Sequence, residues 1–353
     1  MADKATPLQT TSSVVAGEAP APVEAVDTLI PAAQGERLSL FQQALAIPWI
    51  GALLALILLG LFLSVELGPA VFLSSDNFDT VVRSFSFIGI AALGSTIVII
   101  GGGIDLSVGS TMALTGVLTA ITLTAGWPVP LAILVGLGVG AAVGAVNSFL
   151  ITVIRLLPFI ATLGMLSAAR GLGTGIVSGQ TLNASDTFDV IGQGSWGPIP
   201  ISLVLLCALT ALCAYFMTNT TWGRHIYAVG GNEGAARLLG INVAQVKWLM
   251  YILAGVLGAI GGIVLTARLG SGGPGNATGY ELRCIAAAVV GGASLTGGEG
   301  SIFGSLVGAV LLALIQDGLD LNGWGDYWQD LVIGVTILLA VAVDQLRRRL
   351  RRA

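Results

Sequence analysis

The sequence predicts an all-α, polytopic membrane protein with about ten transmembrane helices. Hydrophobic residues make up 55% of its 353 residues and charged residues only 10%, whereas a soluble domain carries about 25% charged residues. The mean hydropathy is +0.91. Apolar stretches long enough to cross a bilayer, which takes roughly 20 residues, recur along most of the chain. These three observations exclude a soluble fold.

The expected spans follow one another with short connections, and tryptophans lie at or near many of their ends, where amphipathic rings prefer the membrane surface. Together they form a transmembrane domain over 48–346. The predicted spans are 48–65, 84–102, 107–125, 129–154, 158–178, 199–218, 247–267, 282–297, 301–317 and 328–344.

The segments that flank this domain are polar or amphipathic. Residues 1–36 lack the apolar core of a signal peptide and predict a disordered cytoplasmic tail. Residues 37–47 predict a short helix on the membrane surface, with leucine and phenylalanine facing lipid. Residues 347–353 form a basic cytoplasmic tail.

The distribution of lysine and arginine predicts the orientation. With the N-terminus inside, eleven of these residues lie on inner segments and three in outer loops. Positive charge accumulates on the cytoplasmic side of membrane proteins. We therefore expect both termini in the cytoplasm.

One polar segment, 219–247, interrupts the apolar sequence on the inner side. It predicts a helix of about seven residues with Asn232 as N-cap and Gly240 as left-handed stop. Glu233 occupies the positive first turn, and Arg237 follows at i+4. A helix this short is marginal alone in water, so we expect it to lean on another protein. The turn before it is expected at Gly230 and Gly231.

Catalytic chemistry is not expected. The only histidine, His225, stands beside an arginine, and no spacing of histidine and cysteine suggests a metal site or a nucleophile triad. The phosphate-binding pattern GxxxxGK[ST] is absent. We expect no catalytic residue, no metal and no cofactor on this chain, so that ATP and magnesium, if used, bind another polypeptide. The three cysteines predict small core residues rather than disulfides.

Asp105 and Ser107 lie in GGGIDLSVGS (101–110), between the second and third spans. Aspartate is favoured just before a helix, where its carboxylate accepts backbone N–H bonds. Ionisable groups at membrane depth are also costly and often functional. Two interpretations stay open: a cap of the third span, or a part of a solute path or gate.

Arg170 lies within a span and must face protein or water, because exposure to lipid costs at least about 2.5 kcal/mol. A tie to a carbonyl or carboxylate at a helix end and a place in the pathway are both open. Asn147 and Gln180 are weaker candidates for polar groups along a route for hydroxylated solutes.

Glycine recurs at every fourth residue in several spans, which predicts close helix packing within the chain. Gly136, Gly140 and Gly144 are one such set. We find no convincing internal repeat. The loops 101–110 and 291–301 look alike, but both fall on the inner side, which does not fit an inverted five-plus-five repeat.

The motifs together resemble the permeases of bacterial ABC sugar importers, the group of the ribose, xylose, arabinose and galactose permeases, with the greatest likeness to the ribose permease. The resemblance covers about residues 48–346 in collinear order. The strings that carry it are GGGIDLSVGS (101–110), PFIATLGMLSAARG (158–171), GRHIYAVGGNEGAARLLGINV (223–243) and GYELRCIAAAVVGGASLTGGEGSIFGSLVGA (279–309).

The resemblance implies a type II-like importer permease in the inner membrane of a bacterium, whose polar segment 219–247 supplies a coupling helix for a cytoplasmic ATPase subunit. It also implies a periplasmic sugar-binding protein and a second permease copy, which would form a homodimer; no nucleic-acid partner is expected. Gly234 departs from the family, which usually has alanine there, so this helix is expected to be looser. The implied ATPase contact is Asn232, Glu233, Ala235, Ala236, Arg237 and Gly240.

We therefore interpret the chain as a permease subunit for a monosaccharide or polyol, with a ribose-like pentose first. An ion-coupled secondary sugar transporter is the alternative, although the span interiors are nearly free of the carboxylates that such carriers use. An intramembrane enzyme and a passive channel fit less well. Ribose, xylose, a hexose, or a polyol such as inositol or xylitol all remain open as solutes.

Overall fold

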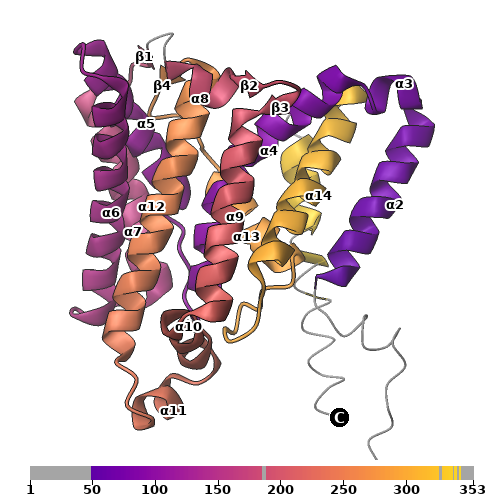
Figure 1. The fold of residues 1–353 in the computed structure, drawn as a ribbon. Coiled ribbons are helices and arrows are strands. Elements are labelled where there is room, and N and C mark those ends of the chain that lie inside the picture. The colour runs from indigo at the N-terminus through magenta and orange to yellow at the C-terminus, as the bar shows by residue number, and fades with distance from the viewer. Residues whose placement is uncertain (1–48, 185–187, 326–327, 337, 340–341, 343–353) are drawn as a thin grey trace, which may run out of the picture. The chain divides into compact units, whose positions relative to one another are not determined.

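The computed structural model describes residues 49–184, 188–325, 328–336, 338–339 and 342 (Figure 1). The predicted tail 1–36, the surface helix 37–47 and the basic tail 347–353 lie outside the described residues. All elements below belong to the unit that begins at Ala44.

The described chain is mostly helical. Two antiparallel pairs of two-residue strands close loops: β1 (Leu182–Asn183) with β4 (Ser271–Gly272), and β2 (Ser195–Trp196) with β3 (Ile199–Pro200). Residues 328–336 are also helical. The named helices are α2 (Ile50–Glu66), α3 (Pro69–Phe72), α4 (Ser75–Ile100), α5 (Val108–Thr124), α6 (Val129–Thr152), α7 (Pro158–Ile176), α8 (Val190–Gln193), α9 (Ile201–Asn219), α10 (Thr221–Gly231), α11 (Glu233–Leu238), α12 (Val243–Leu269), α13 (Tyr280–Val290) and α14 (Ile302–Leu321).

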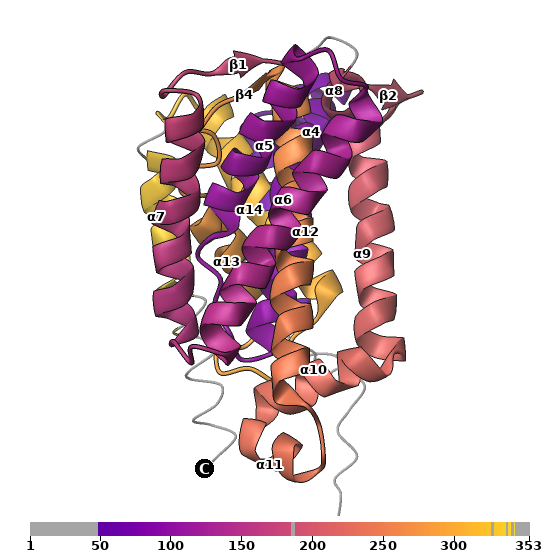
Figure 2. The same ribbon diagram turned by 90° about the vertical axis from the view of Figure 1, so that its left-hand side faces the viewer.

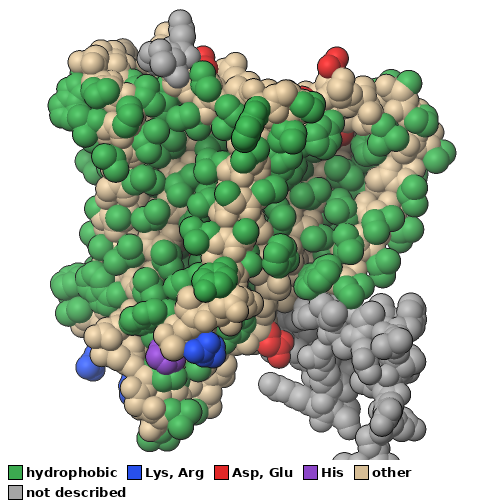
Figure 3. Space-filling view, viewed as in Figure 1, with side chains coloured by type: hydrophobic (Ala, Val, Ile, Leu, Met, Phe, Trp, Pro, Cys, Tyr) green, Lys and Arg blue, Asp and Glu red, His purple; other side chains and the backbone are tan. Residues whose placement is uncertain are grey.

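Within the described residues, six helices are long and apolar enough to cross a membrane: α4, α6, α7, α9, α12 and α14. The apolar helices α2 and α5 are shorter. Figure 3 shows hydrophobic side chains over most of the visible flank, while lysine, arginine and histidine gather near α10 and α11. The helical, multi-span prediction is confirmed at this level.

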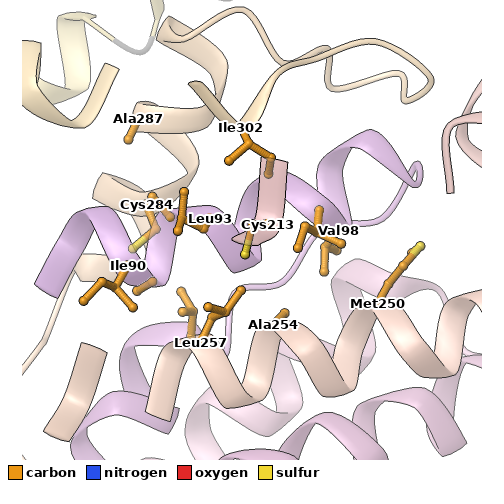
Figure 4. Close-up of a cluster of buried hydrophobic side chains, with 14 of the residues drawn as sticks. Ile90, Leu93, Val98, Cys213, Met250, Ala254, Leu257, Cys284, Ala287 and Ile302 are labelled. Atoms are coloured by element: carbon orange, nitrogen blue, oxygen red, sulfur yellow. The ribbon is translucent and has the colours of Figure 1, made fainter. Parts of the chain in front are cut away.

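Two long helices, α4 and α12, form the centre. They pack against each other, and α12 also packs on α5 and α6 (Figure 2). Figure 4 shows Leu93 of α4 and Leu257 of α12 in one buried cluster with Cys284 of α13. Cys213 and Cys284 are buried, as predicted, but Cys207 is exposed.

Glycines let α6 and α12 approach until their backbones touch. A Cβ atom on Gly140 would lie 2.3 Å from the Gly255 carbonyl oxygen, and one on Gly255 would lie 2.1 Å from that of Gly140. One turn away, a Cβ on Gly144 would meet the Tyr251 carbonyl at 2.2 Å. The predicted close packing of this glycine set is confirmed.

The span predicted at 282–297 is wrong in its extent. The helix there is α13, whose 11 residues reach only about 16 Å, against a hydrocarbon core of about 30 Å. It starts halfway along α4, where Tyr280 stacks on Phe87. Glycine pairs at 291–292 and 297–298 end the helical run, all but Gly291 with positive φ.

A second helix also starts halfway along a neighbour. After α4, residues 101–107 form no regular element, and α5 begins where Val108 lies beside Gly258, near the middle of α12. After α12, residues 273–279 likewise form no regular element before α13 starts. We call 101–107 and 270–279 the unwound segments.

These two halves repeat with opposite direction. The helix α4 runs toward the end that carries α11 (the α11 end), and α5 returns from mid-height toward the end that carries β1 (the β1 end) (Figures 1 and 2). The helix α12 runs toward the β1 end, and α13 returns from mid-height. The pairs α4–α5 and α12–α13 thus run in opposite directions, and we call this arrangement the inverted repeat. Within it, 101–107 corresponds to 270–279 and not to 291–301, the loop whose sequence looks similar.

The glycine contact between α6 and α12 gives a stability prediction. Gly140→Val should lower the thermal unfolding midpoint in detergent by several degrees, because overpacking costs about 1–3 kcal/mol where neighbours cannot shift. Gly138→Val is the matched control, since nothing lies within 4 Å of a Cβ there. Equal midpoints for the two variants would contradict the proposed tight contact.

Candidate functional site

The polar segment begins with α10, which packs along the α11 end of the bundle. Thr220 caps it, accepting from the Gly223 amide at 3.1 Å, and Ile226 and Val229 are buried beneath it. The Tyr227 hydroxyl donates to the Gly300 carbonyl at 2.9 Å, and burial raises the pKa of Tyr227. The segment is thus anchored before α11 starts.

The short helix α11 has the predicted ends. The Asn232 side chain accepts from the Ala235 amide at 2.9 Å, and Gly240 has φ +82°. Arg237 donates to Glu233 at 2.7 Å, the predicted i+4 pair. These local predictions are confirmed. The contact with an ATPase stays a prediction for all six residues of the implied set.

Burial divides the implied contact set. Ala235 and Arg237 are exposed, but Ala236 is only 2% exposed and packs into the chain. Sequence reasoning missed two other residues: Leu238 and Leu239 are 91% and 81% exposed. The sequence did contain a signal for this surface: two adjacent leucines at the end of a polar helix. Large exposed apolar groups often mark contact surfaces.

Glu233 also joins α11 to the central helix. Its second carboxylate oxygen lies 2.7 Å from Lys247 Nζ in the first turns of α12. The pair is partly exposed, so its contribution to stability is small. Its importance is geometric, because one carboxylate holds a residue of α11 and a residue of α12 at the same time.

Three glycine-containing segments near α11 approach until their backbones touch. The Gly298 amide donates to the Ile100 carbonyl at 2.8 Å. A Cβ on Gly230 would lie 1.8 Å from the same carbonyl, and one on Gly297 would lie 2.8 Å from the Gly102 Cα. We call this contact of 100–103, 230–231 and 297–298 the glycine junction. The predicted turn at Gly230 and Gly231 is wrong, because both residues end α10 and their lack of a side chain serves packing.

A cavity of about 200 Å³ lies beside the glycine junction. Its lining includes Glu233 from the middle of the polar segment, Lys247 from the end of that segment, and Tyr251 from α12. It thus opens where the first unwound segment and the polar segment face each other.

Asp105, Ser107 and Asn147 come together, as a shared site would require. Ser107 donates its amide (2.8 Å) and its hydroxyl (2.6 Å) to Asp105, and Asn147 donates to the Ser107 hydroxyl at 2.9 Å. Exposure of the three side chains is at most 4%. Ser107 is the N-cap residue of α5 and forms no side-chain cap bond, so the Asp105 carboxylate closes a turn ahead of the helix and accepts from no amide within it. The two interpretations of Asp105, a cap and a part of a path or gate, both stay predictions.

Arg170 and Gln180 lie apart from that cluster. Arg170 donates to the Pro274 carbonyl at 3.0 Å and to Thr278 Oγ1 at 2.7 Å, so it binds the second unwound segment. Gln180 is exposed in the turn after α7. A pathway role for either residue stays a prediction.

Glu281 was missed by sequence reasoning. It lies in the first turn of α13 near mid-height, and its Oε2 is buried without a hydrogen-bond partner. A Cβ on Gly109 of α5 would lie 2.2 Å from this oxygen, so the two half-length helices meet here. The sequence signal for this residue was an acidic side chain directly before an apolar stretch.

Comparison with known proteins follows this geometry. Residues 77–341 match the family described as the permease component of the branched-chain amino acid transport system. The chain belongs to this permease family. No solved structure matches it.

Three relatives show where in the family it lies. The ribose import permease protein RbsC of Escherichia coli K12 is 41% identical, covering 78% of this chain and 88% of its own. The probable ABC transporter permease protein YphD of the same strain is 40% identical (90% and 96%). The xylose transport system permease protein XylH of Haemophilus influenzae is 33% identical (84% and 96%). The predicted resemblance to sugar importer permeases is confirmed, and so is a multi-pass protein of the inner membrane.

The glycine junction gives a prediction about coupling. Gly230→Ala should lower transport per ATP hydrolysed at least severalfold, because its Cβ has to displace backbone atoms of Ile100 and Gly298. Gly234→Ala is the control, since its Cβ would meet only Asn232 Oδ1 at 3.3 Å and alanine favours the helix. Uptake and ATP hydrolysis measured in proteoliposomes decide it. Equal ratios in both variants would contradict a mechanical role.

Proposed function

We propose that this chain is the membrane-spanning permease subunit of an ATP-driven importer for a monosaccharide or polyol, with a ribose-like pentose as first candidate. The observation that carries the proposal is the geometry of α11. It is a capped helix of six residues at one end of the bundle, tied through Glu233 to its own Arg237 and to Lys247 of α12. The names of RbsC, a ribose import permease, and XylH, a xylose transport permease, support the solute class.

The proposed topology is ten crossings in a type II-like arrangement, with both termini in the cytoplasm. The inverted repeat supports it, because α5 and α13 each complete a crossing together with an unwound segment. The excess of lysine and arginine on one side supports the orientation.

The proposed partners occupy opposite ends. A cytoplasmic ATPase subunit, which carries ATP and magnesium, docks at α11, where Arg237 offers charge and Leu238 offers apolar surface. A periplasmic sugar-binding protein docks at the β1 end. No cofactor binds this chain itself, and the lipid bilayer surrounds its apolar flank.

Motion at α11 has two routes into the bundle. The Glu233–Lys247 pair leads into α12, which ends at the second unwound segment. The glycine junction leads from α10 to Gly102 at the start of the first unwound segment. A displacement of α11 would therefore reach both unwound segments. There a change between outward and inward opening disrupts the fewest packed side chains.

A second copy of this chain is the proposed partner within the membrane, and α7 offers the surface. Gly164, Ala168, Gly171 and Gly175 follow each other at spacings of four and three residues on its exposed side. Outside α7 itself, no described residue has an atom within 4 Å of a Cβ at these glycines. Small residues let two helices approach closely in lipid, so a symmetric contact of two α7 helices fits this face.

Glu281 favours one competing function. An ion-coupled secondary sugar transporter needs a carboxylate at membrane depth. The Glu281 carboxylate has one buried oxygen, Oε2, without a hydrogen-bond partner among the described residues. The two functions differ in their energy source. Uptake driven by an ion gradient in vesicles without ATP would identify the carrier.

The decisive experiment is uptake by the reconstituted complex of permease, ATPase and binding protein. We expect accumulation of ribose or another pentose against its gradient only with hydrolysable ATP. Arg237→Glu should reduce uptake at least tenfold while the ATPase still turns over, because it reverses the exposed charge of α11 and breaks the pair with Glu233.

Arg155→Glu is the charge-matched control, because Arg155 forms no ion pair in the described structure and lies outside α11. Unfolding midpoints of both variants should equal that of the wild type. Unimpaired uptake by Arg237→Glu would refute the coupling role of α11.

Disulfide crosslinking tests the second copy. In a background with Cys207, Cys213 and Cys284 replaced by alanine, Gly171→Cys should give a covalent dimer in oxidised membranes. Leu58→Cys on α2, 66% exposed, serves as the control for random collision. A dimer band no stronger than that of the control would exclude the α7 contact.

A further inference from the structure

A second cavity, of about 540 Å³, lies at the β1 end. It opens between the last turn of α12 and the end of the second unwound segment, and Arg268, Asn276, Thr278 and Tyr280 are among its lining residues. Cavities that hold small molecules measure about 300–1,000 Å³. It is thus large enough for a monosaccharide.

The Tyr280 ring in this cavity is held in place. It stacks on Phe87 with ring centroids 5.6 Å apart, and the Arg283 guanidinium lies 5.2 Å from its centroid. Its hydroxyl forms no hydrogen bond with any described residue. A fixed ring with an unused hydroxyl is a ligand group that needs no ordering on binding.

Arg268 supplies hydrogen-bond donors without a countercharge. One of its nitrogens donates to Ser84 Oγ at 2.9 Å, and its guanidinium lies 5.5 Å from the Phe87 centroid. No carboxylate within the described residues forms an ion pair with it. A guanidinium has five N–H donors, so most of them are left for a ligand or water.

Asn276 supplies an acceptor. Its amide nitrogen donates to the Ser271 carbonyl at 3.3 Å, which fixes the side chain and leaves its oxygen available. The cavity therefore presents donors and an acceptor together with the apolar side chains of α12. A hydroxyl both donates and accepts, so a polyol can use every one of these groups, whereas an apolar solute would leave Arg268 and Tyr280 desolvated without partners.

We propose that this cavity binds a neutral hydroxylated solute, a monosaccharide or polyol, through Tyr280, Arg268 and Asn276. The inference rests on the proposed function and places its solute at one site. The cavity joins the C-terminal turn of α12 to the N-terminus of α13. A bound solute therefore bridges the two helices of one half of the inverted repeat, across the second unwound segment between them.

Protection from thiol modification tests the site without any need for transport. In the cysteine-free background, Leu269→Cys places a reporter on a lining residue that is 51% exposed in the wild type. In the assembled complex, millimolar ribose or xylitol should slow its reaction with a polar thiol reagent at least threefold. Glycine betaine at equal osmolarity should not. Asn183→Cys, on β1 outside the cavity lining, should react at the same rate in all three solutions.

A single hydroxyl then tests the assignment. Tyr280→Phe keeps the ring stack and should weaken protection by ribose about three- to tenfold, the effect of one hydrogen bond. Tyr215→Phe is the matched control, because Tyr215 lies on the lipid-facing side of α9 and is 62% exposed. Protection that is absent in the reporter, or equal in the two tyrosine variants, would overturn the proposal. If the complex shows ATP-driven uptake but no protection, the proposed solute site is wrong and the importer function stands. If it shows protection but no ATP-driven uptake, the importer function is wrong and the site stands.

Discussion

Buried backbone groups of the two unwound segments need hydrogen-bond partners, because no regular helix supplies them there. The structure supplies side chains for this purpose. Thr162 donates to the Ile104 carbonyl at 3.2 Å, and Asp105 accepts from the Ser107 amide at 2.8 Å. In the second segment, Arg170 donates to the Pro274 carbonyl and Asn276 to that of Ser271. The unwound segments before α5 and α13, on which the inverted repeat depends, are possible because these side chains form hydrogen bonds with their backbone groups.

This requirement explains which residues could be predicted. Polar side chains in apolar spans are conspicuous, so Asp105, Ser107 and Arg170 were recognised. What they bind was open, because their partners are carbonyls and hydroxyls that no sequence spacing marks. The Arg170 partner lies 104 positions away. Glu281 was passed over because the break before it contains glycine, asparagine and threonine, which are equally typical of an outer loop.

Helix content was predictable and helix length was not. A hydropathy average depends only on which side chains lie in the window. It therefore has the same value for a helix that spans the membrane and for a half-length helix followed by an apolar turn. Residues 282–297 are mostly apolar, yet α13 ends at Val290. The local ends of α11 were predicted correctly because caps depend on neighbours within four residues, such as Asn232 and Ala235. The glycine junction, by contrast, joins three distant segments, and Gly230 and Gly231 gave a turn signal that tertiary packing overrode.

The same geometry relates the two ends of the molecule. The helix α12 has 27 residues and so extends about 40 Å. Lys247 lies in its first turns, beside Glu233 of α11, and Arg268 lies in its last turn, beside the larger cavity. A helix that moves as a rigid body would carry a displacement at Lys247 to Arg268 at its other end. The force proposed to act at α11 and the solute proposed to bind near Tyr280 would therefore act on opposite ends of one element, which is what coupling between the two sites requires.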